Sequence, residues 1–566
     1  MKFVLKPLCF LCVFCGASFC FSLDREAFSI TNYDLQLQIE PEQHRLGARG
    51  KITLRNDTGA PQKIAVLQIS SSLDWRAIRA GDKMVQFVSQ PYTSDIDHTG
   101  SLSEAIVTLP QEVAPKGTID LNIAYEGVIV LDATRLTRIG TPEDVAKNSD
   151  WDRIDENFTA VRGAGYVAWY PIETDSASLS EGNDLSEVLH RWKERESASE
   201  MSLLFESTGN YKILANGYKG NFVVNVEKPS SVGAFSMYPG ASVPTFVLAD
   251  YRSIDLNSGS SVNFLPGKEA LAKVYANALE NLDVLPESHG PADMQVVQLP
   301  ESGAAPFVSG SLLLSPLSPL TDETMLILVY AMARQKAASP RPWINEGLAH
   351  VAQLLYIEKT HGRTAALEYL KAHADLLRDS EARVAQGDPT SGTTSHSLIS
   401  ATDDLYLQSK AMWVWWMLRD MLGASFDIAL FSYQAPADKD PSYMPRVIAA
   451  HTERDLSWFF DDWVYHDRGL PEFKVGSAFA SKTPTNGFLL TVTLDNTGTA
   501  GAEVPVVIKF AGGEVTKRIE MRAKSKTTVR VETPAAPQEI RVNDGSVPER
   551  NTNNNVFKVE PAASGK

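Results

Sequence analysis

The sequence predicts an α+β protein of several domains, with an N-terminal antiparallel β domain, a mainly helical domain and a C-terminal β-sandwich. Three observations predict this class. Short runs of alternating apolar and polar residues fill the first part of the chain. Helical periodicity dominates from about residue 265 to 465, and alternation returns after Phe473. A chain of 566 residues is also too long for a single hydrophobic core.

The chain begins with the pattern of a secretory signal peptide, which we place at residues 1–22. Lys2 and Lys6 precede an apolar run, Leu8 to Phe21, that is too short to span a bilayer comfortably. We therefore expect an exported protein, secreted or periplasmic. A lipid-modified cysteine and an uncleaved membrane anchor are the alternatives. Every cysteine lies in this segment, so the processed chain has no disulfide and no thiolate ligand: Cys9, Cys12, Cys15 and Cys20.

Residues 23–250 are predicted to form the N-terminal β domain. "YDLQLQIEP" and "TIDLNIAYEG" alternate apolar and polar residues, with Gly, Pro, Asn and Asp between such runs. This pattern is typical of antiparallel strands with one buried face. The segment 144–157 is charged and lacks a period, so we expect an insertion or a long loop there.

Residues 251–470 are predicted to form the mainly helical domain. "DETMLILVYAMARQKA" indicates a helix with Asp322 as its N-cap, and "INEGLAHVAQLLYIEKTHG" indicates one that ends at Gly362. "SKAMWVWWMLRDMLG" is apolar almost all round, which favours a buried helix. Its sulfur and aromatic side chains are expected to pack in a core rather than bind a ligand: Met412, Trp413, Trp415, Trp416 and Met417.

Residues 471–547 return to alternation and predict the C-terminal β-sandwich, and residues 548–566 predict a disordered tail rich in Asn, Pro and Ser. The formal net charge of −16 argues against a nucleic-acid partner, which needs a basic surface. After the signal segment no run approaches 18 uninterrupted apolar residues, so no transmembrane span is expected in the mature chain. No oligomeric state follows from the sequence.

Several strings, in order along the chain, resemble the aminopeptidase N (membrane alanyl aminopeptidase) family of gluzincin metallopeptidases. They are "NYDLQLQIEP", "GNYKILANG", "PTFVLADY", "VVQLPESG" with "SGSLLLSP", "PWINEGLAH" and "DLSWFFDDWVYHDRGLPEFKV". The resemblance covers nearly the whole mature chain. It implies that the helical domain is thermolysin-like.

The residues that such an enzyme needs are largely replaced. The family holds zinc with two His of H-E-x-x-H, whose Glu is the general base, and with a later Glu. The chain has no H-E-x-x-H. The resemblance puts Tyr330 and Arg334 at the His positions and Ala331 at that of the base, while Glu346 keeps the third ligand position. Phe307 falls where the family's amine-binding Glu belongs.

The transition-state tyrosine of the family is also in doubt, because Gln408 aligns with it and Tyr406 lies two residues earlier. We therefore predict that Glu346 pairs with Arg334, in a guanidinium–carboxylate contact under about 4 Å, instead of binding a metal. Further residues expected around the retained substrate cleft are Ser309, Gly310, Asn345 and His350.

Two functions are consistent with these residues. The first is a pseudoenzyme that binds peptides or proteins in the retained cleft and needs no cofactor. The alternative is an active zinc peptidase with displaced ligands. Glu346 and His350, four apart on one helix, are the candidate ligands, with Glu323 or His361 as a third.

Overall fold

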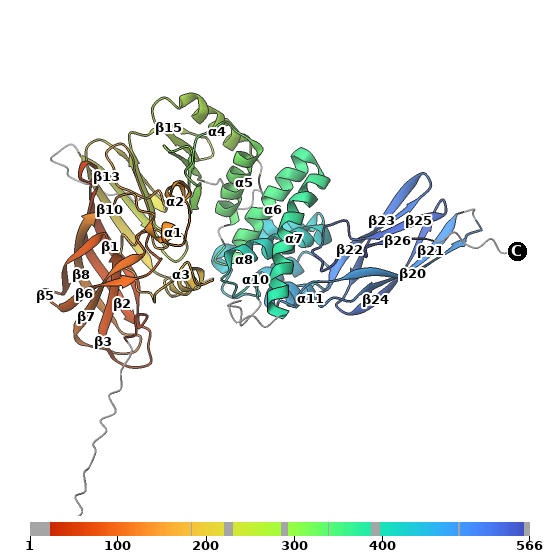
Figure 1. The fold of residues 1–566 in the computed structure, drawn as a ribbon, viewed down its shortest axis with the longest axis horizontal. Helices are drawn as coiled ribbons and strands as arrows, with labels where there is room; N and C mark the ends of the chain where they lie inside the picture. Colours follow the sequence, from red (N-terminus) through yellow and green to blue (C-terminus); the bar gives the residue numbers. More distant parts are fainter. Residues whose placement is uncertain are drawn as a thin grey trace, which may run out of the picture.

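The computed structural model describes residues 23–182, 184–219, 230–282, 284, 293–337, 339–385, 397–484 and 487–559. The predicted signal peptide at 1–22 lies outside them. The chain forms three consecutive units, which follow one another along the long axis of the molecule (Figure 1). None of the helices in the described ranges is long and apolar enough to cross a membrane.

The N-terminal unit is built from three sheets, as the alternating sequence predicts. In β1 the odd-numbered residues from Tyr33 to Ile39 are buried, and Asp34 and Gln36 are more open to solvent. The large sheet has the order β12-β13-β10-β1-β2-β8-β4-β5. Its strands are β1 (Phe28–Glu40), β2 (Arg45–Asn56), β4 (Leu73–Ala80), β5 (Lys83–Met84), β8 (Thr118–Val128), β10 (Glu200–Thr208), β12 (Tyr218–Lys219) and β13 (Ser230–Met237).

Two three-stranded sheets complete this unit. The first comprises β3 (Gln62–Ser70), β6 (Gln86–Thr93) and β7 (Ser101–Val113). The second comprises β9 (Thr159–Arg162), β11 (Lys212–Ala215) and β14 (Thr245–Ala249). Three helices belong to the same unit: α1 (Thr134–Arg138), α2 (Glu143–Ser149) and α3 (Asp184–Arg195).

The segment 144–157 is not the long loop that its composition suggests, because it contains most of α2. Two buried ion pairs hold it in place. Arg135 Nε donates to Asp150 at 2.7 Å, and Arg162 Nε donates to Asp152 at 3.1 Å. Asp150 and Asp152 are therefore internal partners, whereas Asp144 and Lys147 on α2 remain exposed.

A five-stranded sheet of order β15-β16-β17-β19-β18 opens the second unit. Its strands are β15 (Arg252–Asp255), β16 (Ser261–Phe264), β17 (Gln295–Leu299), β18 (Phe307–Ser309) and β19 (Leu312–Pro316). Strand β18 pairs antiparallel with β19 and forms one edge of the sheet. Helix α4 (Glu269–Asn281) packs on β16.

The helices that follow are α5 (Asp322–Ala337), α6 (Pro342–His361), α7 (Arg363–Ala385), α8 (Asp404–Leu422), α9 (Ser425–Ser432), α10 (Tyr443–Ala449) and α11 (Ser457–Phe460). Gly362 ends α6 with φ 86°, as predicted. The prediction that Asp322 caps α5 is wrong. Asp322 is the first helical residue, and Thr321 Oγ1 accepts a hydrogen bond from the Thr324 amide at 3.3 Å.

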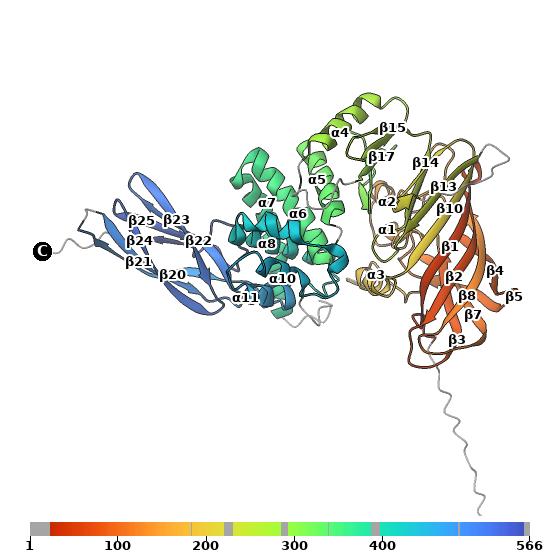
Figure 2. The ribbon, with the colours of Figure 1, turned by 180° about the vertical axis from the view of Figure 1, so that it is seen from behind.

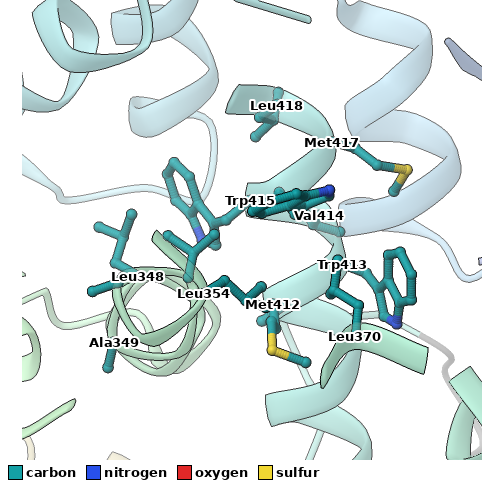
Figure 3. Packing of buried hydrophobic residues seen from close by; sticks show 14 of the residues in the cluster. Leu348, Ala349, Leu354, Leu370, Met412, Trp413, Val414, Trp415, Met417 and Leu418 are labelled. Carbon is teal, nitrogen blue, oxygen red and sulfur yellow. The ribbon is translucent and has the colours of Figure 1, made fainter. Parts of the chain in front are cut away.

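Helix α8 is buried, as its sequence predicts, and its aromatic residues belong to the core. Trp415 stacks on Trp343 of α6, with ring centroids 5.3 Å apart, and its Nε1 donates to the Trp343 carbonyl. Figure 3 shows side chains of α6, α7 and α8 in this one cluster. Gly347 permits the close approach, because a Cβ there would lie 2.3 Å from Trp415 Cδ1.

The C-terminal unit consists of two packed sheets. One has the order β20-β21-β24 and the other the order β23-β22-β25-β26. The strands are β20 (Phe473–Lys482), β21 (Phe488–Asn496), β22 (Ala502–Phe510), β23 (Gly513–Met521), β24 (Ser525–Thr533), β25 (Pro537–Val542) and β26 (Val556–Lys558).

The prediction of a disordered tail from residue 548 is wrong for residues 548–559. Strand β26 pairs with β25. Glu549 is fully buried and accepts hydrogen bonds from the Phe473 amide at 2.8 Å and from Asn543 Nδ2 at 2.7 Å. Asn555 is also buried and donates to Glu549, so polar residues of this segment satisfy one another inside the sandwich. Residues 560–566 lie outside the described ranges.

Candidate functional site

Helices α5 and α6 bring three of the predicted site residues to one point. Tyr330 and Arg334 are four apart on α5 and so share a face. Both reach Glu346 on α6. Arg334 Nε lies 2.9 Å from Glu346 Oε1, and the Tyr330 hydroxyl donates to Glu346 Oε2 at 2.5 Å. The predicted contact between Arg334 and Glu346 is therefore present, and Tyr330 joins it. We call these three residues the Arg334 cluster.

The cluster also ties α5 to the edge strand β18, because Arg334 Nη1 donates to the Val308 carbonyl at 3.3 Å. Burial opposes the positive charge of Arg334, but the Glu346 carboxylate outweighs it and the pKa of Arg334 is raised. Burial and the same carboxylate raise the pKa of Tyr330. Arg334 thus stays charged, and Tyr330 stays a protonated donor.

Solvent still reaches the cluster. The side chains of Arg334 and Glu346 are 29% and 13% exposed. A small ligand or the end of a peptide can therefore reach polar atoms of the cluster from outside.

The residues of the cluster do not fit a zinc ion. A guanidinium has no lone pair to donate to a metal. Glu346 uses one oxygen for Arg334 and the other for Tyr330. Ala331, at the position of the general base, is fully buried and carries no polar atom. In the ranges that the structure describes, no three His, Cys, Asp or Glu side chains gather in a group that could hold a metal ion.

His350 lies beside the cluster but engages other partners. Its Nδ1 lies 2.9 Å from Gln353 Oε1, and Gln353 Nε2 donates to the Leu326 carbonyl. The Gln353 oxygen must therefore accept, which places the imidazole proton on Nδ1. Burial lowers the pKa of His350, so the ring is neutral near pH 7. Its ring packs on Tyr330, with centroids 5.1 Å apart.

The other residues proposed for a displaced metal site point elsewhere. His361 Nε2 lies 3.2 Å from Asp322, at the end of α6, and Glu323 is exposed in the first turn of α5. Asn345 is half-buried, and its Oδ1 has no hydrogen-bond partner among the described residues.

Strand β18 places three further predicted residues at the N-terminal unit. The Phe307 ring packs edge-on against Tyr166, with centroids 5.2 Å apart. Ser309 is buried; its hydroxyl donates to the Val243 carbonyl at 2.6 Å and accepts from Asn216 Nδ2 at 3.2 Å. Gly310 turns the chain with φ 53°. These residues fix the edge strand in position.

Tyr406 lies on α8 and bonds to a partner that the sequence analysis did not anticipate. Its hydroxyl donates to Asp467, whose other oxygen lies 2.5 Å from Lys410 Nζ. Burial acts to raise the pKa of Asp467, but Lys410 and Tyr406 outweigh it and the pKa is lowered. Gln408, which lies between Tyr406 and Lys410 in the sequence, is half-buried.

One cation near the cluster was missed altogether. Lys193, on α3 of the N-terminal unit, is half-buried. Burial lowers its pKa, and the charges of Asp404, Arg334 and Glu346 act on it. Its own segment carries no motif, so the influence of these charges on Lys193 could not be predicted from the sequence.

Comparison with known proteins gives similarity in structure only. No family model matches the sequence, and no curated protein matches it. One similar solved structure is an M1 zinc metallopeptidase from Deinococcus radiodurans bound to a Tyr-Ser-Ala substrate, with TM-score 0.47, 16% identity, and 80% of this chain and 96% of that chain covered. A second structure from Deinococcus radiodurans has TM-score 0.44, 16% identity and coverage of 77% and 93%. At this identity the similarity concerns the fold alone.

Proposed function

We propose that this chain is an exported, peptidase-like protein without zinc-dependent catalysis, which binds peptides or protein segments at the Arg334 cluster. The peptide-binding part rests on the sequence resemblance and on the solvent access of the cluster between β18, α5 and α6. Export rests on the predicted signal peptide alone.

The observation that carries the proposal is the pairing of Glu346 with Arg334 and Tyr330. Both carboxylate oxygens are engaged, and the guanidinium supplies the positive charge that a metal ion would otherwise bring. A cation that cannot accept a water lone pair cannot activate that water as a nucleophile, whereas zinc does so by lowering its pKa. The cluster can therefore orient a ligand through hydrogen bonds and charge, without hydrolysing it.

Two measurements on the purified chain test this proposal. The first is release of chromophore from aminoacyl-anilides, with added zinc and with a chelator. We expect no turnover in either case. The second is fluorescence anisotropy of dye-labelled short peptides, for which we expect saturable binding that Arg334→Met weakens. Chelator-sensitive turnover would establish the alternative, a zinc peptidase with displaced ligands. Lack of peptide binding would remove the binding role.

A further inference from the structure

The N-terminal unit holds the edge strand β18 at both of its ends. The Ala305 amide donates to the Asn148 carbonyl at 2.8 Å, and Trp151 Nε1 donates to the Ala305 carbonyl at 3.1 Å. Asn148 lies on α2, which Figures 1 and 2 show on the side of the N-terminal unit that faces the helical unit. Ser309, at the other end of β18, is bonded to the same unit. These contacts fix β18 beside the Arg334 cluster.

Phe307 and Tyr166, which we call the aromatic pair, meet at this border. Their rings pack edge-on with centroids 5.2 Å apart, and both side chains are half-buried. The Arg162 guanidinium carbon lies 3.7 Å from the centroid of the Tyr166 ring and 3.9 Å from that of Trp151. This stacking holds the Tyr166 ring in place against Phe307. The part of the aromatic pair that remains open to solvent is therefore a fixed surface.

The buried charges next to the aromatic pair are already balanced. Arg162 is buried, and its Nε and Nη2 donate to Asp152 at 3.1 and 2.6 Å. Arg135 is also buried, and its Nη2 donates to Asp150 at 2.7 Å. Because each of these carboxylates has its own guanidinium, neither is left to balance the charge of a ligand.

The Arg334 cluster does not supply a free carboxylate either. Val308 follows Phe307 directly and accepts from Arg334, so the cluster and the aromatic pair are adjacent. Glu346 uses one oxygen for Arg334 and the other for Tyr330. A ligand ammonium placed between them would lose hydration, gain no ion pair from these groups and lie close to a guanidinium, which is unfavourable.

We infer that the aromatic pair binds an uncharged, apolar group of the ligand, so that the chain takes N-terminally blocked or internal peptide segments rather than free amino termini. This inference rests on the proposed function and names the class of ligand. The sequence resemblance agrees with it, because Phe307 aligns with the Glu that binds the amine in the aminopeptidase N family.

The test measures binding of three probes to the full chain by fluorescence anisotropy. Each probe is Leu-Ala-Ala followed by a dye-labelled lysine amide. The first has a free amino terminus, the second is acetylated, and the third carries Gly-Ser-Gly-Ser before the leucine. The first and third probes have the same charge, so they differ in where the ammonium lies. Salt of about 0.15 M screens the long-range attraction of a cation to the net charge of −16.

We expect the acetylated probe to bind about tenfold more tightly than the free amine, because it brings no unpaired charge to β18. If the extended probe matches the acetylated one, internal segments are ligands. If it binds as weakly as the free amine, the ligand is a blocked end.

Variants assign the preference to the aromatic pair. Phe307→Glu supplies a carboxylate, and we expect it to bind the free amine at least as tightly as the acetylated probe. Phe307→Leu keeps an uncharged side chain and should keep the wild-type order of affinities. The control is Phe479→Glu, the same change at a phenylalanine of β20 that is 71% exposed, and it should bind as wild type does.

The wild-type comparison alone can overturn the inference, whether or not Phe307→Glu folds. Equal affinity for the free and acetylated probes, or tighter binding of the free amine, would remove it and leave the proposed function. Loss of such an amine preference in Asp404→Asn would name that acid of α8 as the amine anchor instead. A folded Phe307→Glu variant that keeps the wild-type order would also remove the inference. If no probe binds, the proposed function falls with it.

Discussion

The guanidinium of Arg334 lies against the carboxylate of Glu346, with Nε 2.9 Å from Oε1, and this contact joins α5 to α6 at the centre of the candidate site. The sequence resemblance aligns these residues with the positions at which the aminopeptidase N family holds zinc. The Arg334 guanidinium therefore has two effects. It balances the charge of the Glu346 carboxylate, and its remaining N–H groups can donate to a ligand.

The first prediction concerns the stability of the Arg334 cluster. Glu346→Gln removes the negative charge that offsets Arg334 and leaves the guanidinium partly buried without an ionic partner. We expect a loss of about 1–2 kcal/mol in the free energy of unfolding, at the low end for a charged hydrogen bond because both side chains touch solvent. Urea titration measures it. Glu323→Gln, an exposed acid on α5, should change stability little.

Gly347 supplies a second prediction. Alanine in its place would raise helix propensity by about 1 kcal/mol. Its Cβ would, however, lie 2.3 Å from Trp415 Cδ1 and 2.9 Å from Ala411 Cβ. Overpacking a core of this kind costs about 1–3 kcal/mol, so we expect Gly347→Ala to be destabilising on balance. Thermal unfolding shows whether Gly347→Ala lowers or raises the melting temperature. Gly59→Ala is the control, because nothing lies within 4 Å of its Cβ position. A stabilised Gly347→Ala variant would show that α6 and α8 are not in close contact.

His350 gives the chain a specific pH dependence. An unfolded histidine has a pKa of about 6.5, and burial lowers the folded value. A depressed folded pKa means that the stabilising contribution is complete above about pH 6.5 and is lost as the pH falls below it.

We therefore expect the unfolding free energy to fall as the pH falls below about 6.5, and to fall less steeply in His350→Gln. His373 contributes in the same direction, since burial and His350 lower its pKa. If the unfolding free energy of His350→Gln falls with pH as steeply as that of the wild type, a group other than His350 causes the pH dependence.

The ordered segment after residue 547 supplies a fourth prediction. Glu549 accepts from the Phe473 amide and from two asparagine side chains, Asn543 and Asn555, at 2.7–2.8 Å. Glu549→Ala leaves these donors buried and unpaired, which should cost about 3 kcal/mol or more. Glu514→Ala, an exposed acid on β23, is the matched control. Calorimetry measures the melting temperature of each variant. Equal melting temperatures for Glu549→Ala and Glu514→Ala would mean that the segment adds no stability.

The helical part of the fold was predictable because its helices have clear hydrophobic periodicity and clear C-terminal signals in the sequence. Helix α6, with its end at Gly362, and the buried helix α8 follow from spacing and composition alone. The contact of Arg334 with Glu346 was also predictable, because the resemblance aligns both residues with positions that bind one ion in the aminopeptidase N family.

The rest depends on contacts that no local pattern encodes. Tyr406 donates a hydrogen bond to Asp467, 61 positions away in the sequence. The charges of Arg334 and Glu346 act on Lys193, which lies on α3 of the N-terminal unit. Charged residues misled the sequence analysis in two places, α2 and the segment around Glu549. Asp150 and Asp152, which follow α2, and Glu549 are buried with hydrogen-bond partners, and composition alone cannot distinguish a buried charge from a solvated one.

Zinc stoichiometry distinguishes an internal ion pair at Arg334 and Glu346 from a metal site. Wild type and the variant Tyr330→His/Arg334→His are dialysed against the same zinc buffer, and bound metal is measured by mass spectrometry. The variant frees Glu346 and restores two imidazoles on one helical face. We expect substoichiometric zinc in the wild-type chain and a gain of zinc in the variant. One tightly held zinc per wild-type chain would contradict it.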